Sequence, residues 1–190
     1  MAIAWVFPGQ GSQKVGMAEG VLELPGGRER FAAASELLGR DLLSICAGEA
    51  EGTLSDLNDT RNTQPALFVL ESLLVDALRA QGRQADVVAG HSLGELVALY
   101  AAGVFDVDTG LRLMRRRSEL MAAAGGGAMT AVMGFDRGEL ESLVAATRFS
   151  SSSRSNPITA VMAPPPALAL RSLRICISRR PVATSNTPAA

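Results

Sequence analysis

The chain has 190 residues, which is enough for one ordinary domain with a buried core. Its formal net charge of −1 at pH 7 favours no strongly charged partner, so we expect neither nucleic acid nor a membrane surface to bind it. Cys46 and Cys176 lie far apart without metal-ligand spacing, which predicts a reduced, cytoplasmic protein with no disulfide and no metal. No apolar run is long enough to span a bilayer, and the first residues lack the basic region of a signal peptide.

Charge is distributed unevenly along the chain. Residues 1–147 carry 12 basic and 19 acidic side chains, a net charge of −7, whereas residues 148–190 carry six arginines and no acid. The later segment begins with a serine run, contains three consecutive prolines and lacks a clear helical or strand period over most of its length. We therefore expect residues 148–190 to form a tail that is disordered or loosely attached.

One strand and two helices are predicted in the first half of the chain. IAWVF at residues 3–7 is a short β-favouring run, and the glycine-rich loop GQGSQ follows it. Residues 28–38 are predicted to be helical, and residues 49–63 are polar and typical of a loop. A helix over residues 64–81 is favoured by a proline in its first turn and a glycine just after its end.

Strands and helices alternate in the second half. Short strands are predicted at residues 86–89 and 128–134, and helices at residues 93–102, 108–124 and 136–146. Asp106 or Asp108 is the expected N-cap of the helix at 108–124. Strands that alternate with long helices predict an α/β fold with a parallel sheet and flanking helices.

The most informative stretch is AGHSLGELVALYAAG at residues 89–103, in which Gly90-His91-Ser92-Leu93-Gly94 forms the pattern G-x-S-x-G. In this pattern a serine lies on a sharp turn between a strand and a helix, with its hydroxyl exposed and the glycines relieving crowding. The next backbone N–H, that of Leu93, lies at a helix N-terminus and can stabilise an oxyanion. The pattern predicts a nucleophilic serine, and the alternative is a glycine-rich connection with a capping serine.

Four segments occur together and in order: FPGQGSQKVGM, NTQPAL, AGHSLGELVAL and GLRLMRRRSELM. With them the chain resembles the malonyl-CoA:acyl-carrier-protein transacylases, the malonyltransferases of type II fatty acid synthesis, over residues 1 to about 146. The resemblance implies a hydrolase-like large α/β domain that is incomplete over residues 1–127. It also implies the start of a small ferredoxin-like subdomain over residues 128–147, and it leaves residues 148–190 outside the family.

The resemblance also implies an activity. An acyltransferase of this family moves a malonyl group from malonyl-CoA to the phosphopantetheine thiol of acyl carrier protein through a malonyl ester on a serine. Matched residue by residue, Ser92 is the nucleophile, and the backbone N–H groups of Gln10 and Leu93 form the oxyanion hole. Gln64 matches a family glutamine close to the site, for which ordinary polarity at a helix start is the alternative. No cofactor is implied besides the two substrates, and a monomer is expected.

Helical spacing singles out Arg117 among three consecutive arginines. The residues three and four positions away from it are all apolar, namely Leu113, Met114, Leu120 and Met121. We expect Arg117 on the buried side of its helix, where a guanidinium needs an anionic partner, and Arg115 and Arg116 in solvent. The family places its malonate-binding arginine at this position, where a bidentate pair with a carboxylate selects malonyl over acetyl. A salt bridge to a core carboxylate is the alternative.

The general base is missing from this arrangement. The family uses a histidine well downstream of the serine, but this chain has one histidine, His91, directly beside Ser92. Adjacent side chains on a sharp turn diverge, so we expect His91, with Gly90 and Gly94, to support the elbow rather than to accept the proton. The match stops near residue 147 and the tail resembles an out-of-frame translation. We therefore expect a truncated or frameshifted transacylase with impaired or absent activity, and a basic arm for an acidic partner is the alternative for the tail.

Two other functions fit parts of the sequence. An α/β-hydrolase such as a thioesterase or lipase also uses GHSLG, but it needs an Asp and a His after the serine and leaves GQGSQ and Arg117 unexplained. A catalytically dead fragment would at most bind CoA thioesters or carrier protein. Transfer to a thiol separates the acyltransferase from the hydrolase, and any covalent acylation separates both from the fragment.

Overall fold

The computed structural model describes residues 2–124, 129–130, 138–139, 141–142 and 160–161. The elements are β1 (Ala4–Phe7), α1 (Glu19–Leu22), α2 (Gly27–Leu38), α3 (Leu42–Ala47), α4 (Thr60–Ala80), β2 (Val87–Gly90), α5 (Leu93–Ala101), α6 (Val107–Ala123), β3 (Met129–Thr130) and β4 (Ala160–Val161). The elements from β1 to α5 belong to one compact unit that includes residues up to Leu120, and β3 and β4 belong to a second unit.

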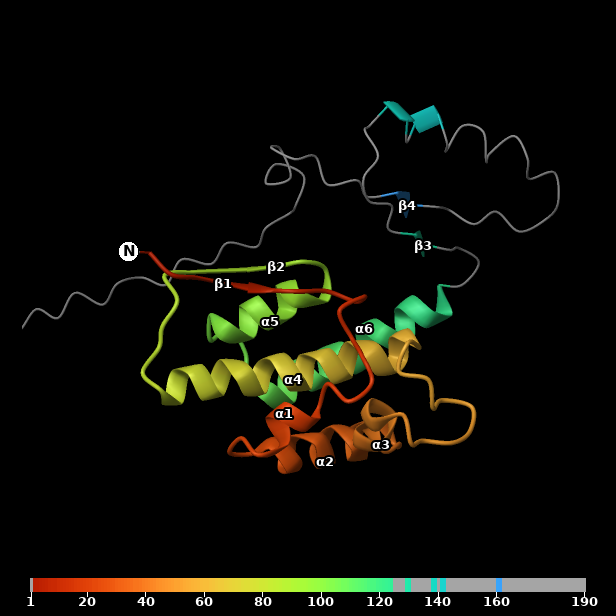
Figure 1. The fold of residues 1–190 in the computed structure, drawn as a ribbon, viewed down its shortest axis with the longest axis horizontal. Coiled ribbons are helices and arrows are strands. Elements are labelled where there is room, and N and C mark those ends of the chain that lie inside the picture. The colour runs from red at the N-terminus through yellow and green to blue at the C-terminus, as the bar shows by residue number, and fades with distance from the viewer. Residues whose placement is uncertain (1, 125–128, 131–137, 140, 143–159, 162–190) are drawn as a thin grey trace, which may run out of the picture. The chain divides into compact units, whose positions relative to one another are not determined.

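In the first unit, β1 and β2 form a parallel pair (Figure 1). The register sets Ala4 opposite Val87 and Phe7 opposite Gly90, so both strands end at the same edge. The backbone N–H of His91 continues the ladder by donating to the carbonyl of Phe7 at 3.1 Å. Because the two strands end together, the GQGSQ loop after β1 and the Ser92 turn after β2 emerge side by side.

The helices of the first unit pack in layers against this strand pair. Helix α5 packs on β1 and β2 and also on α4, and α1, α2 and α3 lie beyond α4 (Figure 1). The ring of Phe68 in α4 packs edge-on against Tyr100 of α5, with ring centroids 5.9 Å apart. On α6, Gly110 approaches α4 so closely that a Cβ there would lie 2.1 Å from the Phe68 ring. Helix α4, which is buried along most of its length, is therefore the centre of the core.

Five of the predicted elements are confirmed to within one residue at each end: the strands at 3–7 and 86–89 and the helices at 28–38, 93–102 and 108–124. Asp106 rather than Asp108 caps α6, because its Oδ1 accepts a hydrogen bond from the N–H of Thr109 at 2.8 Å. The prediction of a loop over 49–63 is wrong at its end, since α4 begins at Thr60. Asp59 starts the helix by accepting from the N–H of Arg61 at 2.9 Å.

The second unit is described at a few positions. Strand β3 pairs in parallel with β4, with Met129 opposite Ala160 and Thr130 opposite Val161. Strand β3 falls within the strand predicted at 128–134, and residues 138–139 and 141–142 of the helix predicted at 136–146 are helical. The rest of both predictions, and residues 148–190 apart from β4, lie outside the described residues. In the described ranges, no helix combines the length and apolar character needed to cross a bilayer.

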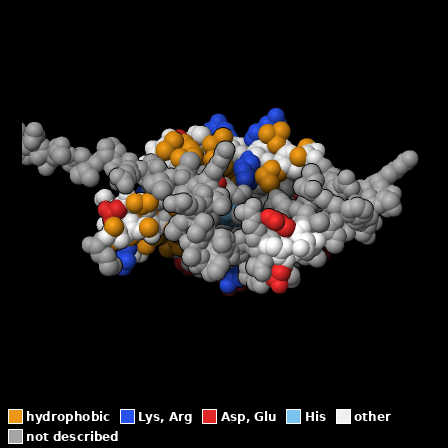
Figure 2. Space-filling view, turned by 90° about the horizontal axis from the view of Figure 1, so that it is seen from above, with side chains coloured by type: hydrophobic (Ala, Val, Ile, Leu, Met, Phe, Trp, Pro, Cys, Tyr) orange, Lys and Arg blue, Asp and Glu red, His pale blue; other side chains and the backbone are white. Residues whose placement is uncertain are grey.

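The first unit has an apolar groove of about 560 Å³ between β1 and α4. Its lining includes Trp5 and Phe7 from the strand and Leu67, Leu74 and Leu78 from the helix. Glu71 lies in the same wall and is 4% exposed, and both of its carboxyl oxygens are buried. Large hydrophobic side chains also reach the surface elsewhere, and Figure 2 shows hydrophobic and basic side chains next to each other on one face.

Candidate active site

Ser92 lies in the turn that connects β2 to α5, and its side chain is exposed. Its backbone angles are φ 56° and ψ −107°, and among the described residues it is the one non-glycine residue with positive φ. Such a conformation costs about 1–3 kcal/mol and is found mainly at functional sites, where the surrounding structure enforces it. The geometry is that of the strained strand-to-helix turn that the G-x-S-x-G pattern predicts.

Two glycines make this turn possible. A Cβ on Gly90 would lie 2.0 Å from the carbonyl carbon and oxygen of Gly94, and a Cβ on Gly94 would lie 2.3 Å from the carbonyl oxygen of Phe7. Both contacts are with backbone atoms, which cannot move aside as a side chain can. The N–H of Leu93 is the first of α5, so it has no acceptor within the helix and lies beside Ser92.

Arg117 from α6 contacts the serine directly. Its Nη2 donates to Ser92 Oγ at 2.9 Å, and its Nη1 donates to Gln64 Oε1 at 2.5 Å. Partial burial lowers the pKa of Arg117 below its ordinary value, and the negative charge of Glu95 opposes this shift. Arg117 has no carboxylate in an ion pair with it within residues 2–124, which does not favour the core salt bridge considered as an alternative.

The expected surroundings of Arg117 need a correction. Of its four apolar neighbours on α6 only Met114 is buried, whereas Leu113, Leu120 and Met121 are 40%, 52% and 41% exposed. Helical spacing identifies residues that share a face, but other elements decide how much of that face they cover. The buried stripe of α6 consists of Gly110, Leu111, Met114 and Ser118, and Arg117 lies at its edge. Arg115 and Arg116 are exposed, as expected, and Arg115 pairs with Glu119.

Gln64 bonds Arg117 directly, and the hydroxyl group of Thr60 connects Gln10 to Gln64. Gln64 is fully buried, and its Nε2 donates to Thr60 Oγ1 at 2.8 Å. Thr60 Oγ1 in turn donates to Gln10 Oε1 at 2.9 Å. The structure therefore brings Gln10, Gln64, Arg117 and Ser92 into one continuous set of hydrogen bonds. Thr60 was not predicted from the sequence, and its spacing of four residues from Gln64 on a helix was the available signal.

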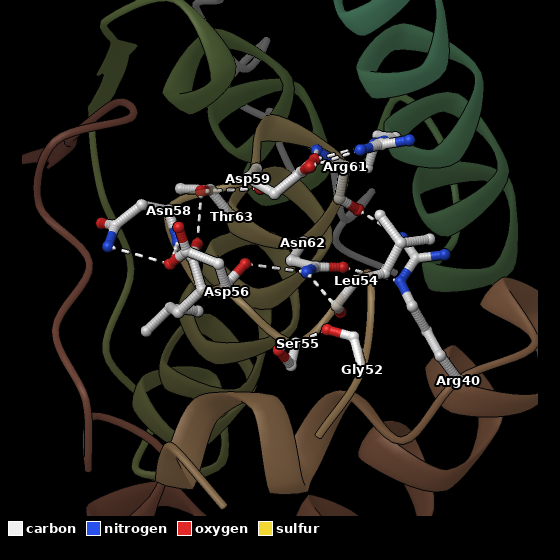
Figure 3. A network of polar contacts seen from close by, with 11 residues as sticks. Arg40, Gly52, Leu54, Ser55, Asp56, Asn58, Asp59, Arg61, Asn62 and Thr63 are labelled. Atoms are coloured by element: carbon white, nitrogen blue, oxygen red, sulfur yellow. Dashed lines mark hydrogen bonds and ion pairs between the residues drawn. The ribbon is translucent and has the colours of Figure 1, made fainter. Parts of the chain in front are cut away.

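A second polar network holds the first turn of α4 (Figure 3). The same helix carries Thr60 and Gln64. Arg40 donates from Nε to Asn62 Oδ1 and from Nη2 to the carbonyl of Arg61, both at 2.6 Å. Asn62 is fully buried and donates from Nδ2 to the carbonyls of Leu54 and Asp56, at 3.0 and 2.8 Å. Burial lowers the pKa of Arg40. The network fixes the chain before α4 against the helix, and neither Arg40 nor Asn62 was predicted from the sequence.

His91 lies at the elbow, and within residues 2–124 its hydrogen bonds are made by its backbone. Its N–H donates to Phe7, and its carbonyl accepts from the N–H of Gly94 at 2.9 Å. Across residues 2–124, Ser92 Oγ has one hydrogen-bond partner, Arg117, and no bond joins it to the His91 ring. No group of acidic, histidine or cysteine side chains that could hold a metal ion is found in the described ranges.

A parallel strand pair with a strained, exposed serine at the start of the following helix defines an α/β protein with the strand–turn–helix geometry of the G-x-S-x-G pattern. Comparison with known families assigns it further. The acyl transferase domain model matches residues 4–166, which is most of the chain, and the chain belongs to this family. The sequence predicts that the resemblance ends near residue 147, but the matched range extends beyond it to residue 166.

Individual relatives agree with this assignment. The malonyl CoA-acyl carrier protein transacylase of Synechocystis sp. is 52% identical over 141 residues, which are 74% of this chain and 47% of that protein. The polyketide biosynthesis malonyl CoA-acyl carrier protein transacylase PksC of Bacillus subtilis is 46% identical over 135 residues, 70% of this chain and 45% of that protein. The chain thus spans about half the length of the curated relatives it matches.

Solved structures support the fold. The crystal structure of the Synechocystis transacylase matches with a TM-score of 0.66 at 51% identity, covering 75% of this chain and 47% of that one. A complex described as a type II PKS acyl-carrier protein with its malonyl-transacylase matches with a TM-score of 0.65 at 33% identity, covering 81% and 50%. The predicted acyltransferase fold is confirmed, and the findings support the acyltransferase rather than the α/β-hydrolase that shares GHSLG.

Proposed function

We propose that this chain carries the nucleophile and the carboxylate-binding side of a malonyltransferase site. Ser92 takes a malonyl group from malonyl-CoA, and the phosphopantetheine thiol of acyl carrier protein takes it from Ser92. The observation that carries the proposal is the position of Arg117, whose guanidinium lies 2.9 Å from Ser92 Oγ and is bonded to neutral oxygens. A guanidinium held there without a carboxylate partner from residues 2–124 suits an acyl group that brings its own carboxylate.

The proposed reaction has two halves. In the first, Ser92 Oγ bonds to the thioester carbonyl carbon, and the carbonyl oxygen becomes an oxyanion beside the N–H groups of Gln10 and Leu93. The C–S bond then breaks, and the CoA thiolate leaves and takes up a proton. In the second half, the carrier thiol gives up its proton and attacks the ester carbonyl. The bond to Ser92 Oγ breaks and that oxygen regains a proton.

The proton of Ser92 needs an acceptor in the first half. Arg117 only donates hydrogen bonds, so it cannot take the proton, although it can attract the substrate carboxylate. The resemblance implies a downstream histidine for this step, and the chain has one histidine, His91. We therefore propose that acylation of this chain is slow and depends on a base from solution.

Intact-protein mass spectrometry tests the proposal. The folded protein is incubated with malonyl-CoA, with and without imidazole as a diffusible base, beside a Ser92→Ala variant. We expect a malonyl increment on the wild type that imidazole accelerates and that the variant lacks. Addition of phosphopantetheinylated acyl carrier protein should then remove the increment and place it on the carrier. Folded protein that gains no increment with imidazole would refute the proposal and leave a fragment that at most binds its ligands.

Malonyl-CoA and acyl carrier protein are the proposed partners. The names of the relatives and the complex of a related transacylase with a carrier protein support this choice. Release of free malonate without transfer to the carrier would instead favour a thioesterase. We further propose that the chain works as a monomer in the cytoplasm, where a buried free thiol such as that of Cys46 stays reduced.

A further inference from the structure

The hydrogen bonds around Thr60 run in one direction. Arg117 has only donors, so it fixes the carbonyl end of the Gln64 amide toward itself. The amide nitrogen of Gln64 then points to Thr60 Oγ1 and donates to it. The threonine hydroxyl has a single proton, which it donates to Gln10 Oε1. Each group in the series can therefore adopt one orientation when the others are in place.

Thr60 joins the loop after β1 to the rest of this series. Gln10 belongs to the loop after β1, and Gln64 and Arg117 come from α4 and α6. The side chain of Gln10 is exposed, so the bond from Thr60 restrains a residue that solvent would otherwise leave mobile. Thr60 itself is held as the first residue of α4, directly after the Asp59 cap.

We propose that Thr60 is a positioning residue that sets the Gln64 amide against Arg117 and ties the Gln10 loop to them. The functional part of this inference rests on the proposed malonyltransferase activity. Through Gln64, the threonine orients the guanidinium that meets the substrate carboxylate. Through Gln10, it holds the loop whose N–H faces the oxyanion. Thr60 touches neither the serine nor the acyl group, so it acts through Gln64 on the choice of acyl group and through Gln10 on the oxyanion loop.

A Thr60→Val variant tests the inference because valine keeps the shape of threonine and removes the hydroxyl. The main measurement is NMR of the free protein, in which the side-chain amide of Gln64 and the guanidinium of Arg117 are followed. We expect both signals to shift in Thr60→Val and to keep their wild-type positions in Thr60→Ser, which retains the hydroxyl. Loss of one hydrogen bond of this kind should also lower the preference for malonyl-CoA over acetyl-CoA by roughly five- to tenfold.

Asn58→Ala is the matched control. Asn58 Oδ1 accepts from Gln13 Nε2 at 3.0 Å, so this bond ties the same loop to the chain before α4 without touching Gln64. The control should leave the Gln64 and Arg117 signals unchanged. Unchanged signals in Thr60→Val, or equal shifts in Thr60→Ser or Asn58→Ala, would overturn the inference. If the wild type does not become acylated, the proposed function fails, but the NMR comparison still decides the role of Thr60.

Discussion

The carboxyl group of Glu71 allows a quantitative prediction about stability. Glu71 is 4% exposed in the wall of the groove between β1 and α4, and neither carboxylate oxygen has a hydrogen-bond partner within residues 2–124. Burial raises the pKa of Glu71 from 4.5 to about 8. The folded chain thus keeps a proton that the unfolded chain releases at much lower pH.

The sign and size of the effect follow from this difference. Between pH 4.5 and about 8 the folded state binds more protons than the unfolded state, so the free energy of unfolding falls as pH rises. One proton corresponds to a slope of about 1.4 kcal/mol per pH unit, and the loss over the whole window is on the order of 5 kcal/mol at most. The contribution is complete below the lower pKa and absent above the higher one.

A Glu71→Gln variant keeps the shape of the side chain and removes the titration. Urea unfolding of both proteins, followed by the fluorescence of Trp5 in the same groove, gives the free energy of unfolding from about pH 5 to about pH 8. The variant minus wild-type difference should increase with pH at close to the one-proton slope. A difference that does not change with pH would refute the reasoning. It would mean that the carboxylate is hydrated, or is paired with a cation such as Lys14, which lines the same groove.

Three further predictions concern packing and reactivity. Gly94→Ala should lower the free energy of unfolding by more than about 3 kcal/mol, because the new Cβ meets rigid backbone. Gly20→Ala places its Cβ in open space and should be tolerated. Equal melting temperatures of the two variants would contradict this. Arg40→Ala should lower the free energy of unfolding, measured with a chemical denaturant, by about 2–3 kcal/mol because it leaves buried acceptors unpaired. Arg116 is exposed, so Arg116→Ala should change this free energy little. Similar losses in both variants would contradict the role of the network. Burial raises the pKa of Cys46 to about 12, so its thiol should not react in the folded protein. In a variant whose other cysteine is replaced by serine, iodoacetamide should label the chain only after unfolding. Rapid labelling of the folded variant would count against the buried thiol.

Features encoded by neighbouring residues could be predicted from the sequence. The turn at Ser92 needs a small residue on each side and a strand and helix next to it, and all of these lie within a few positions of one another. The strand pair is short and apolar, and its limits follow from the turn residues that bound it. For the same reason the ends of α2, α5 and α6 agree closely with the prediction.

The start of α4 was misjudged because its first turn is polar. Asn62, Thr63 and Gln64 are each fully buried, and their side chains are bonded to the preceding loop, to Arg40 and to Thr60. A polar stretch predicts solvent exposure when burial is unknown. Here the polar groups are satisfied by partners elsewhere in the chain, which the local pattern does not reveal.

The sequence predicted which residues belong to the candidate site, but not the hydrogen bonds that connect them. Ser92, Gln64, Gln10 and Arg117 were identified, and they lie together. The bond from Thr60 to Gln10 spans 50 positions in the sequence, so no periodic pattern indicates it. Nor could spacing alone show that the face of α6 around Arg117 is largely exposed.

A competition between malonyl-CoA and acetyl-CoA for Ser92 tests the central claim most directly. Equal concentrations of both thioesters are offered to the wild type, Arg117→Ala and Arg117→Lys with imidazole present, and the ratio of malonyl to acetyl adducts is read by mass. The ratio does not depend on the base, because both thioesters meet the same nucleophile. We predict that the wild type prefers malonyl, that alanine lowers the ratio at least about tenfold and that lysine restores it only in part. An equal ratio in all three proteins would contradict the claim that Arg117 binds the substrate carboxylate.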